Sequence, residues 1–114
     1  MPEVKLEGVV EGIEPGRIKG QKIVTVKLAN GGTLVHDAVR EVIDLSEGDK
    51  VSIVLSEERP ANLDEYMFCG NGYLVAPESE KGKTIFSVWG LIFIFEPPLG
   101  LETDKKYYIC IKRK

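Results

Sequence analysis

Short segments in which apolar and polar residues largely alternate dominate this sequence, and this pattern constrains the fold more than any other feature. The alternation is clearest in Val4–Val10, Lys22–Ala29 and Lys50–Ser56. A period of two places the apolar side chains of a β-strand on one face, whereas an amphipathic helix needs a period near 3.6. We therefore expect an all-β protein whose strands each bury one side.

Glycine-rich and polar segments separate these strands and supply the turns. Asn30–Gly32 is a strong hairpin signal, because Asn and Gly accept the positive φ angles of a tight two-residue turn. Thr33–Asp37 then returns as a strand, and Lys106–Lys112 closes the chain as another. Short strands joined by such turns predict a small antiparallel barrel. With 114 residues, we expect one domain over residues 1–114.

Two segments leave their structure open. Residues 37–47 lose the alternation: Asp37 is a suitable helix cap and Gly48 a suitable helix end, but the β-branched residues between them suit an irregular loop equally well. Residues 65–75 form a strand-like run that is interrupted at Cys69–Gly72. The interruption is either a hairpin turn or a bend within one long strand.

The two cysteines, Cys69 and Cys110, lie in apolar, strand-like surroundings. Neither has the CxxC or histidine spacing that is typical of a zinc site, so we expect no metal. Their separation allows a disulfide, but nothing else in the sequence points to an oxidising compartment. We therefore expect two buried, unpaired thiols that behave as small apolar side chains.

The segment Thr84–Phe95 is apolar on both sides when it is read as one strand. One face then carries Trp89, Leu91, Phe93 and Phe95, and the other carries Val88, Ile92 and Ile94. A strand of a small monomeric barrel usually exposes one face to water, so a second apolar face needs a cover. The cover is either a loop of the same chain or another protein, and we favour another protein. Gly90 would be a bend in the strand or a place where the partner's backbone comes close.

The sequence contains no converging set of catalytic groups. His36 is the only histidine and lies in a predicted strand, the carboxylates are scattered, and the common phosphate-binding and nucleophile motifs do not occur. A net charge of −3 does not favour binding to nucleic acid phosphates. The first residues do not form a basic, apolar secretion signal, and no apolar run is long enough to span a bilayer, so we expect a cytoplasmic protein.

Three segments occur in the order and spacing of a known family. They are Glu58–Val75, Phe86–Phe95 and Lys105–Lys114. Together they resemble the small barrel subunit shared by eukaryotic nuclear RNA polymerases and its archaeal counterpart, the G subunit. The matching positions are Glu58, Arg59, Pro60, Glu65, Tyr66, Gly70, Tyr73, Ser87, Gly90, Leu91, Tyr107, Tyr108 and Lys112. The long acidic loop of the eukaryotic form is absent here, which favours the archaeal form.

The resemblance implies an eight-stranded antiparallel barrel related to the oligonucleotide-binding (OB) fold. It also implies a peripheral, non-catalytic subunit that docks on the largest subunit of DNA-directed RNA polymerase and supports assembly and stability during transcription. We expect such a subunit to have no cofactor and to make no direct contact with nucleic acid. The residues that we expect at the contact with the largest subunit are Arg59, Trp89, Gly90, Leu91 and Phe93.

The resemblance also favours one of the two structures for residues 65–75. The eukaryotic relatives carry residues in place of Asn71–Gly72 that disfavour positive φ angles, so we expect one continuous strand with a bulge or bend at Gly70–Gly72 and a packed Cys69. A second hypothesis for the function is a stand-alone barrel that binds single-stranded nucleic acid. In that case Tyr107 would stack on a base and Lys106 would contact a phosphate.

Overall fold

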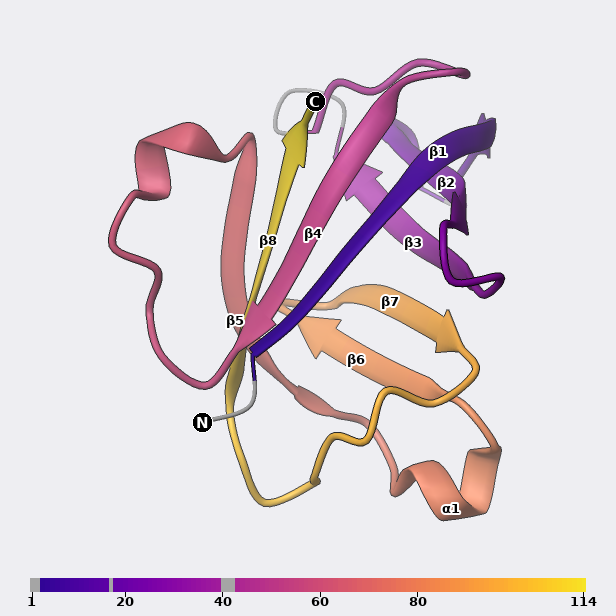
Figure 1. Ribbon diagram of the computed structural model, residues 1–114. Helices are drawn as coiled ribbons and strands as arrows, with labels where there is room; N and C mark the ends of the chain where they lie inside the picture. The colour runs from indigo at the N-terminus through magenta and orange to yellow at the C-terminus, as the bar shows by residue number, and fades with distance from the viewer. Residues whose placement is uncertain (1–2, 17, 40–42) are drawn as a thin grey trace.

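The computed structural model describes residues 3–16, 18–39 and 43–114 (Figure 1). Eight strands close into an antiparallel barrel in the order β1-β2-β3-β7-β6-β5-β8-β4. The strands are β1 (Glu3–Pro15), β2 (Gln21–Leu28), β3 (Thr33–Val39), β4 (Lys50–Ser56), β5 (Phe68–Leu74), β6 (Thr84–Val88), β7 (Leu91–Glu96) and β8 (Tyr107–Arg113). The prediction of an all-β antiparallel barrel of about eight strands is therefore confirmed.

The alternation in the sequence fills the barrel as predicted. In β2, for example, Val24, Val26 and Leu28 are buried, while Thr25 and Lys27 between them point outward. The largest completely enclosed side chains come from five different strands, and they are Phe86, Phe93, Phe95, Leu34, Ile53, Leu55, Ile109 and Ile111. One continuous apolar core thus occupies the barrel interior.

The apolar segment from Thr84 to Phe95 is two strands and not one. Val88 pairs with Leu91, so the chain reverses over only two residues, Trp89 and Gly90. Their φ angles are 52° and 88°, both positive as a tight hairpin turn of this length requires. Tryptophan is not a residue that predicts such a turn, so the sequence pattern does not indicate the reversal.

The interrupted run at residues 65–75 is continuous in the structure. Strand β5 pairs with β8 from Phe68 to Gly72 without a register shift, and from Tyr73 it pairs with β6. The hairpin alternative is wrong, and no bulge interrupts the pairing with β8. At Gly72 a Cβ atom would overlap the carbonyl oxygen of Ser87 on β6. Glycine is needed there because the two backbones approach closely.

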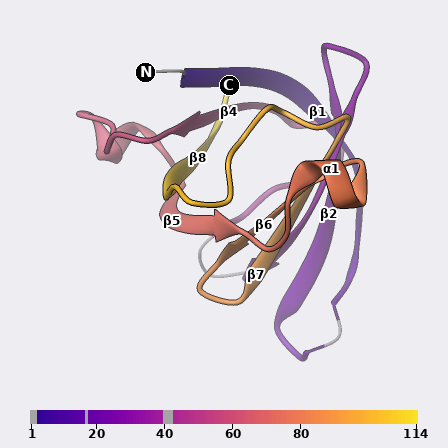
Figure 2. The ribbon, with the colours of Figure 1, turned by 90° about the horizontal axis from the view of Figure 1, so that it is seen from below.

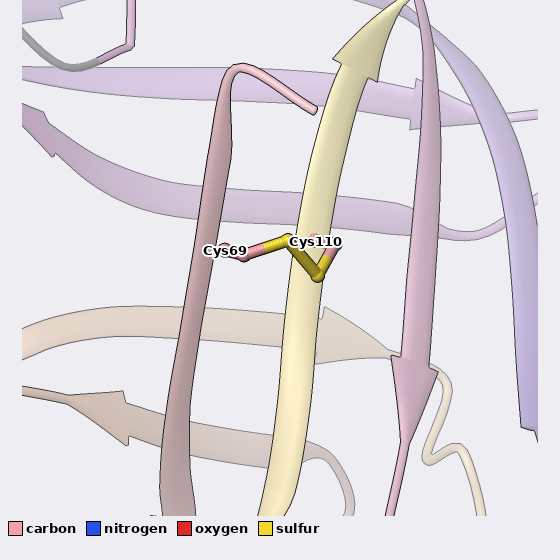
Figure 3. The surroundings of a disulfide bond; sticks show 2 residues. All are labelled: Cys69 and Cys110. Atoms are coloured by element: carbon pink, nitrogen blue, oxygen red, sulfur yellow. A yellow bond between two sulfur atoms is a disulfide. The ribbon is translucent and has the colours of Figure 1, made fainter. Parts of the chain in front are cut away.

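Cys69 and Cys110 form a disulfide, which corrects the expectation of two unpaired thiols (Figure 3). The residues lie directly opposite each other on β5 and β8, with Cα atoms 4.2 Å apart. Both side chains leave the sheet on its outer side, because Phe68 and Gly70 on β5 point inward. The separation of 41 positions between the cysteines in the sequence gives no indication of this pairing.

Residues 37–47 contain no helix where the structure describes them. Asp37 lies within β3 and therefore caps nothing, and residues 43–46 have no regular structure. The part of this prediction that falls on residues 40–42 lies outside the described residues. Two short helical segments occur elsewhere, η1 (Leu63–Glu65) before β5 and α1 (Glu78–Lys81) before β6. Among the described residues, no helix has the length and apolar character needed to cross a membrane.

Candidate protein-docking surface

The outer side of strands β2, β3, β7 and β6 carries a continuous set of half-buried aliphatic side chains. In the register of the sheet, Val35 lies opposite Ile94, and Ile94 lies opposite Ile85. Ile92 precedes Ile94 by two residues on the same side, and Ile23 lies on the neighbouring strand β2. We call these five side chains the apolar face.

A groove of about 430 Å³ runs along the apolar face. Its lining is formed by Ile18, Gln21, Ile23, Val35, His36, Asp37, Gly90, Ile92 and Ile94. Ile18, in the β1–β2 connection, is 63% exposed, so a large aliphatic side chain stands in solvent beside the groove. The volume of the groove lies within the range of about 300 to 1,000 Å³ that is typical of binding pockets.

Among the described residues that line the groove, Asp37 is the one that carries a carboxylate. It pairs with Ile23 across the β2–β3 ladder, and its Oδ2 accepts a hydrogen bond of 3.0 Å from the backbone N–H of Ile92. This bond fixes the carboxylate between two isoleucines. None of the ion pairs among the described residues includes Asp37.

Trp89 stands at the tip of the β6–β7 turn, next to the groove residue Gly90. Its side chain is 74% exposed, and the ring makes a T-shaped contact with Phe68 on β5, with ring centroids 6.3 Å apart. A positive φ angle is unfavourable for a bulky residue. The turn thus holds a large aromatic side chain in solvent at a cost in backbone energy.

His36 lies under the apolar face, inside the barrel. Its ring stacks on Phe93 with centroids 5.0 Å apart, and it is almost completely enclosed. Burial lowers the pKa of His36 from 6.5 to about 4, although the carbonyl and the carboxylate of Asp37 partly oppose this effect. The side chain is therefore neutral at physiological pH and acts as part of the core, as expected for a structural histidine.

The predicted contact residues do not lie together in the structure. Gly90 lines the groove, Trp89 is exposed but its ring lies against Phe68 on β5, and Leu91 is half-buried against the core. Phe93 is completely buried, with 0% exposure, so its side chain does not reach the surface of the barrel. Arg59 is exposed in the β4–β5 connection, which carries η1 and projects from the barrel on the side away from β2 (Figures 1 and 2).

The position of Phe93 follows from the turn at Trp89 and Gly90. Because the chain reverses there, the inward side of β7 carries Phe93 and Phe95, and the outward side carries Ile92 and Ile94. The sequence pattern groups Ile92 with Ile94 on one face, but the predicted contact residues lie on the other, so Ile92 and Ile94 were missed, together with Val35 and Asp37 on β3. The alternation around buried His36 indicates that Val35 and Asp37 point outward, but only the strand order places them beside β7.

The outer side of β1, β4 and β8 is different, and its charges are compensated within the chain. We call the outward side chains of Glu3, Lys5, Glu7 and Lys112, with the chain end Lys114, the charged face. Lys5 pairs with Glu3 at 3.4 Å, and Lys114 pairs with Glu7 at 2.7 Å. The Lys112 ammonium lies 5.6 Å from the centre of the Tyr66 ring.

The structure argues against the nucleic-acid hypothesis, because the aromatic ring that is expected to stack on a base is buried. Tyr107 points into the barrel, where it is 3% exposed and its hydroxyl accepts a hydrogen bond from the backbone N–H of Glu102. A base cannot stack on a ring in this position. The described residues also contain no group of three or more His, Cys, Asp or Glu side chains that could hold a metal ion.

The fold and the surface together define a small closed β-barrel with an apolar outer face, a class to which protein-binding subunits belong. The family model for the G subunit of DNA-directed RNA polymerase matches residues 3–114, and the chain belongs to this family. It is therefore a non-catalytic subunit of DNA-directed RNA polymerase, and its partners are proteins of that complex.

Two archaeal relatives carry the description "DNA-directed RNA polymerase subunit Rpo8". The protein from Sulfolobus acidocaldarius is 29% identical, and the match covers 92% of this chain and 93% of the relative. The protein from Saccharolobus solfataricus is also 29% identical, with 97% and 93% covered. A solved structure of the cytoplasmic molybdate-binding protein ModG matches with a TM-score of 0.37 and 16% identity, which is too low to bear on fold or function.

Proposed function

We propose that this chain docks on the largest subunit of DNA-directed RNA polymerase through its apolar face, and that it supports the assembly and stability of the complex. The observation that carries this proposal is the apolar face itself, five half-buried aliphatic side chains, and the exposed Trp89 lies in the turn that joins β6 and β7. Contiguous apolar surface with a large aromatic residue is typical of interfaces between subunits.

The energy available from such a surface is large enough to hold a subunit in place. Burying apolar surface yields about 25 cal/mol per Å², and a buried tryptophan removes about 150 to 250 Å² from water. Because most of the Trp89 side chain is exposed in the free chain, most of this area is still available for a partner to cover. Residues of this type are frequent among the few that dominate the energy of an interface.

The remaining expectations belong to the same proposal. The described strands run from Glu3 to Arg113 in one barrel, which supports a single domain over residues 1–114. A relation to the OB fold remains a prediction from the family resemblance. The cytoplasmic location also remains a prediction, and it would follow from the location of the polymerase complex.

Co-purification with polymerase tests the proposal. A tagged copy expressed in its own host should bring down the polymerase, and the purified chain should bind the purified largest subunit in solution. Trp89 is the only tryptophan, so its fluorescence should shift to the blue and resist quenching when that subunit is added. If the tagged chain brings down no polymerase, or if the isolated largest subunit does not bind, the proposal is wrong.

A further inference from the structure

A charged carboxylate lies within the apolar face, and a purely apolar partner that covered it would have to remove its water at a large cost in free energy. The Asp37 carboxylate lies between Ile23 and Ile92 on the lining of the groove. The N–H of Ile92 gives it one hydrogen bond but no positive charge. A partner that fills the groove must remove water from this carboxylate, and burying an unpaired charge is strongly unfavourable.

Carboxylates also border the apolar face on both sides. Glu14 on β1 pairs with Ile23 on β2, and Glu96 on β7 pairs with Thr33 on β3. Neither takes part in an ion pair among the described residues. Among the residues of β2, β3 and β7 that the structure describes, Lys27, which pairs with Thr33 and Val9, is the cation on this side. The face is therefore apolar in its centre and predominantly acidic in its charges.

We propose that the groove binds an apolar segment of the polymerase's largest subunit that carries a lysine or arginine, and that this cation pairs with Asp37. This inference rests on the proposed function and specifies the chemistry of the contact. The aliphatic part of the segment covers Val35, Ile92 and Ile94, and the long stem of a basic side chain packs on the isoleucines while its charged end reaches the carboxylate. Ile18, an exposed residue that lines the groove, helps to shield the ion pair from water.

An uncharged amide at position 37 gives the sharpest test. Asp37→Asn keeps the size of the side chain and an oxygen that can accept the hydrogen bond from Ile92, but it leaves the partner's cation unpaired. We expect the variant to bind the purified largest subunit at least about thirtyfold more weakly than the original chain. Glu3→Gln removes the same charge from the charged face and should leave the affinity unchanged. Unaltered circular dichroism and thermal unfolding verify that each variant is folded.

The outcomes separate the two proposals. If the original chain binds and Asp37→Asn binds equally well, the role of Asp37 is refuted while docking on the largest subunit stands. If Asp37→Asn and Glu3→Gln lose the same affinity, net charge and not the groove controls binding, and the inference is again refuted. If the original chain does not bind, the proposed function fails and the inference fails with it.

A crosslinking experiment tests the partner's chemistry without altering Asp37. Val35 is replaced by the photoreactive p-benzoyl-phenylalanine, the complex is irradiated, and the crosslinked peptide is identified by mass spectrometry. We expect a peptide of the largest subunit that is apolar and contains a lysine or arginine, and we expect no such product when the reagent replaces Lys5 on the charged face. A crosslink to another subunit, or to a peptide without a basic residue, overturns the inference.

Discussion

The two outer sides of this barrel are built from strands of the same kind but expose different side chains to water. On the charged face, ion pairs such as Lys5–Glu3 and Lys114–Glu7 compensate the charges within the chain. On the apolar face, Asp37 has no cation among the described residues, and isoleucine and valine replace polar side chains. The side chains of the charged face are stable in contact with water, whereas burial of the apolar face by a partner lowers the free energy.

The disulfide lies between these two regions. Of the changes considered, its removal should lower the stability of the free chain most. Cys69 and Cys110 are 41 residues apart and enclose β6, β7 and most of the apolar face. Closing a loop of this length in the unfolded chain stabilises a protein by about 4 kcal/mol. Cys69→Ala/Cys110→Ala should lower the free energy of unfolding in urea by about that amount.

Reduction of the original chain provides the control for this prediction. A reducing agent should destabilise the original chain and leave the double variant unchanged. Equal stability of the oxidised chain and the double variant would contradict the role of the disulfide. If the double variant stays folded but no longer binds polymerase, the disulfide also maintains the shape of the apolar face.

His36 should make the stability of the core under the apolar face depend on pH. Its pKa is 6.5 in the unfolded chain and about 4 in the barrel, because burial disfavours the charged ring. The unfolded chain therefore binds more protons between these values, so stability is complete above pH 6.5 and falls as the pH drops towards 4. The loss across this window is about 3 kcal/mol.

Urea unfolding between pH 7 and pH 4 measures this loss. Carboxylates titrate in the same range, so the informative quantity is the difference between the original chain and His36→Phe, which keeps a ring stacked near Phe93. The stability of the variant should fall less steeply with decreasing pH. Parallel pH profiles for the two proteins would mean that His36 does not carry the effect.

Truncation of Trp89 should separate binding from folding. Trp89→Ala removes the most exposed aromatic side chain but little of the core, so we expect at least about thirtyfold weaker binding to the largest subunit and a small change in thermal stability. Glu7→Gln breaks an ion pair on the charged face and should alter neither quantity by much, because exposed ion pairs contribute less than about 1 kcal/mol. Titration calorimetry measures the affinities, and equal affinities for both variants would remove Trp89 from the contact.

The barrel could be predicted from the sequence because its main signal is local. Alternation from Val24 to Leu28 in β2 is visible in consecutive residues, and it fixes which side chains point inward. The disulfide could not be predicted in this way, since it depends on β5 and β8 being neighbours. The same holds for the groove, where Asp37 meets Ile92 only because β3 lies beside β7.

The error at Phe93 has a different physical cause. Asn and Gly usually mark a tight turn in the sequence, as in the β2–β3 connection, where Gly31 has a φ angle of 94°. Trp89 occupies the first central position of the β6–β7 turn, so the sequence resembles an uninterrupted strand. Trp89 and Gly90 are exposed at this turn, whereas Phe93, which the sequence predicts as a contact residue, belongs to the core.

The smallest expected effect concerns the backbone energy stored at Trp89. Asparagine tolerates a positive φ angle better than alanine does, so Trp89→Asn should be more stable than Trp89→Ala by about 1 kcal/mol. Both variants lose the contact with Phe68 and the exposed ring, so the difference between them reports the backbone alone. Both should bind the largest subunit equally weakly. A more stable turn that binds less well would mean that Trp89 is retained for docking at the expense of the free barrel, whereas equal stability of the two variants would show that its backbone is unstrained.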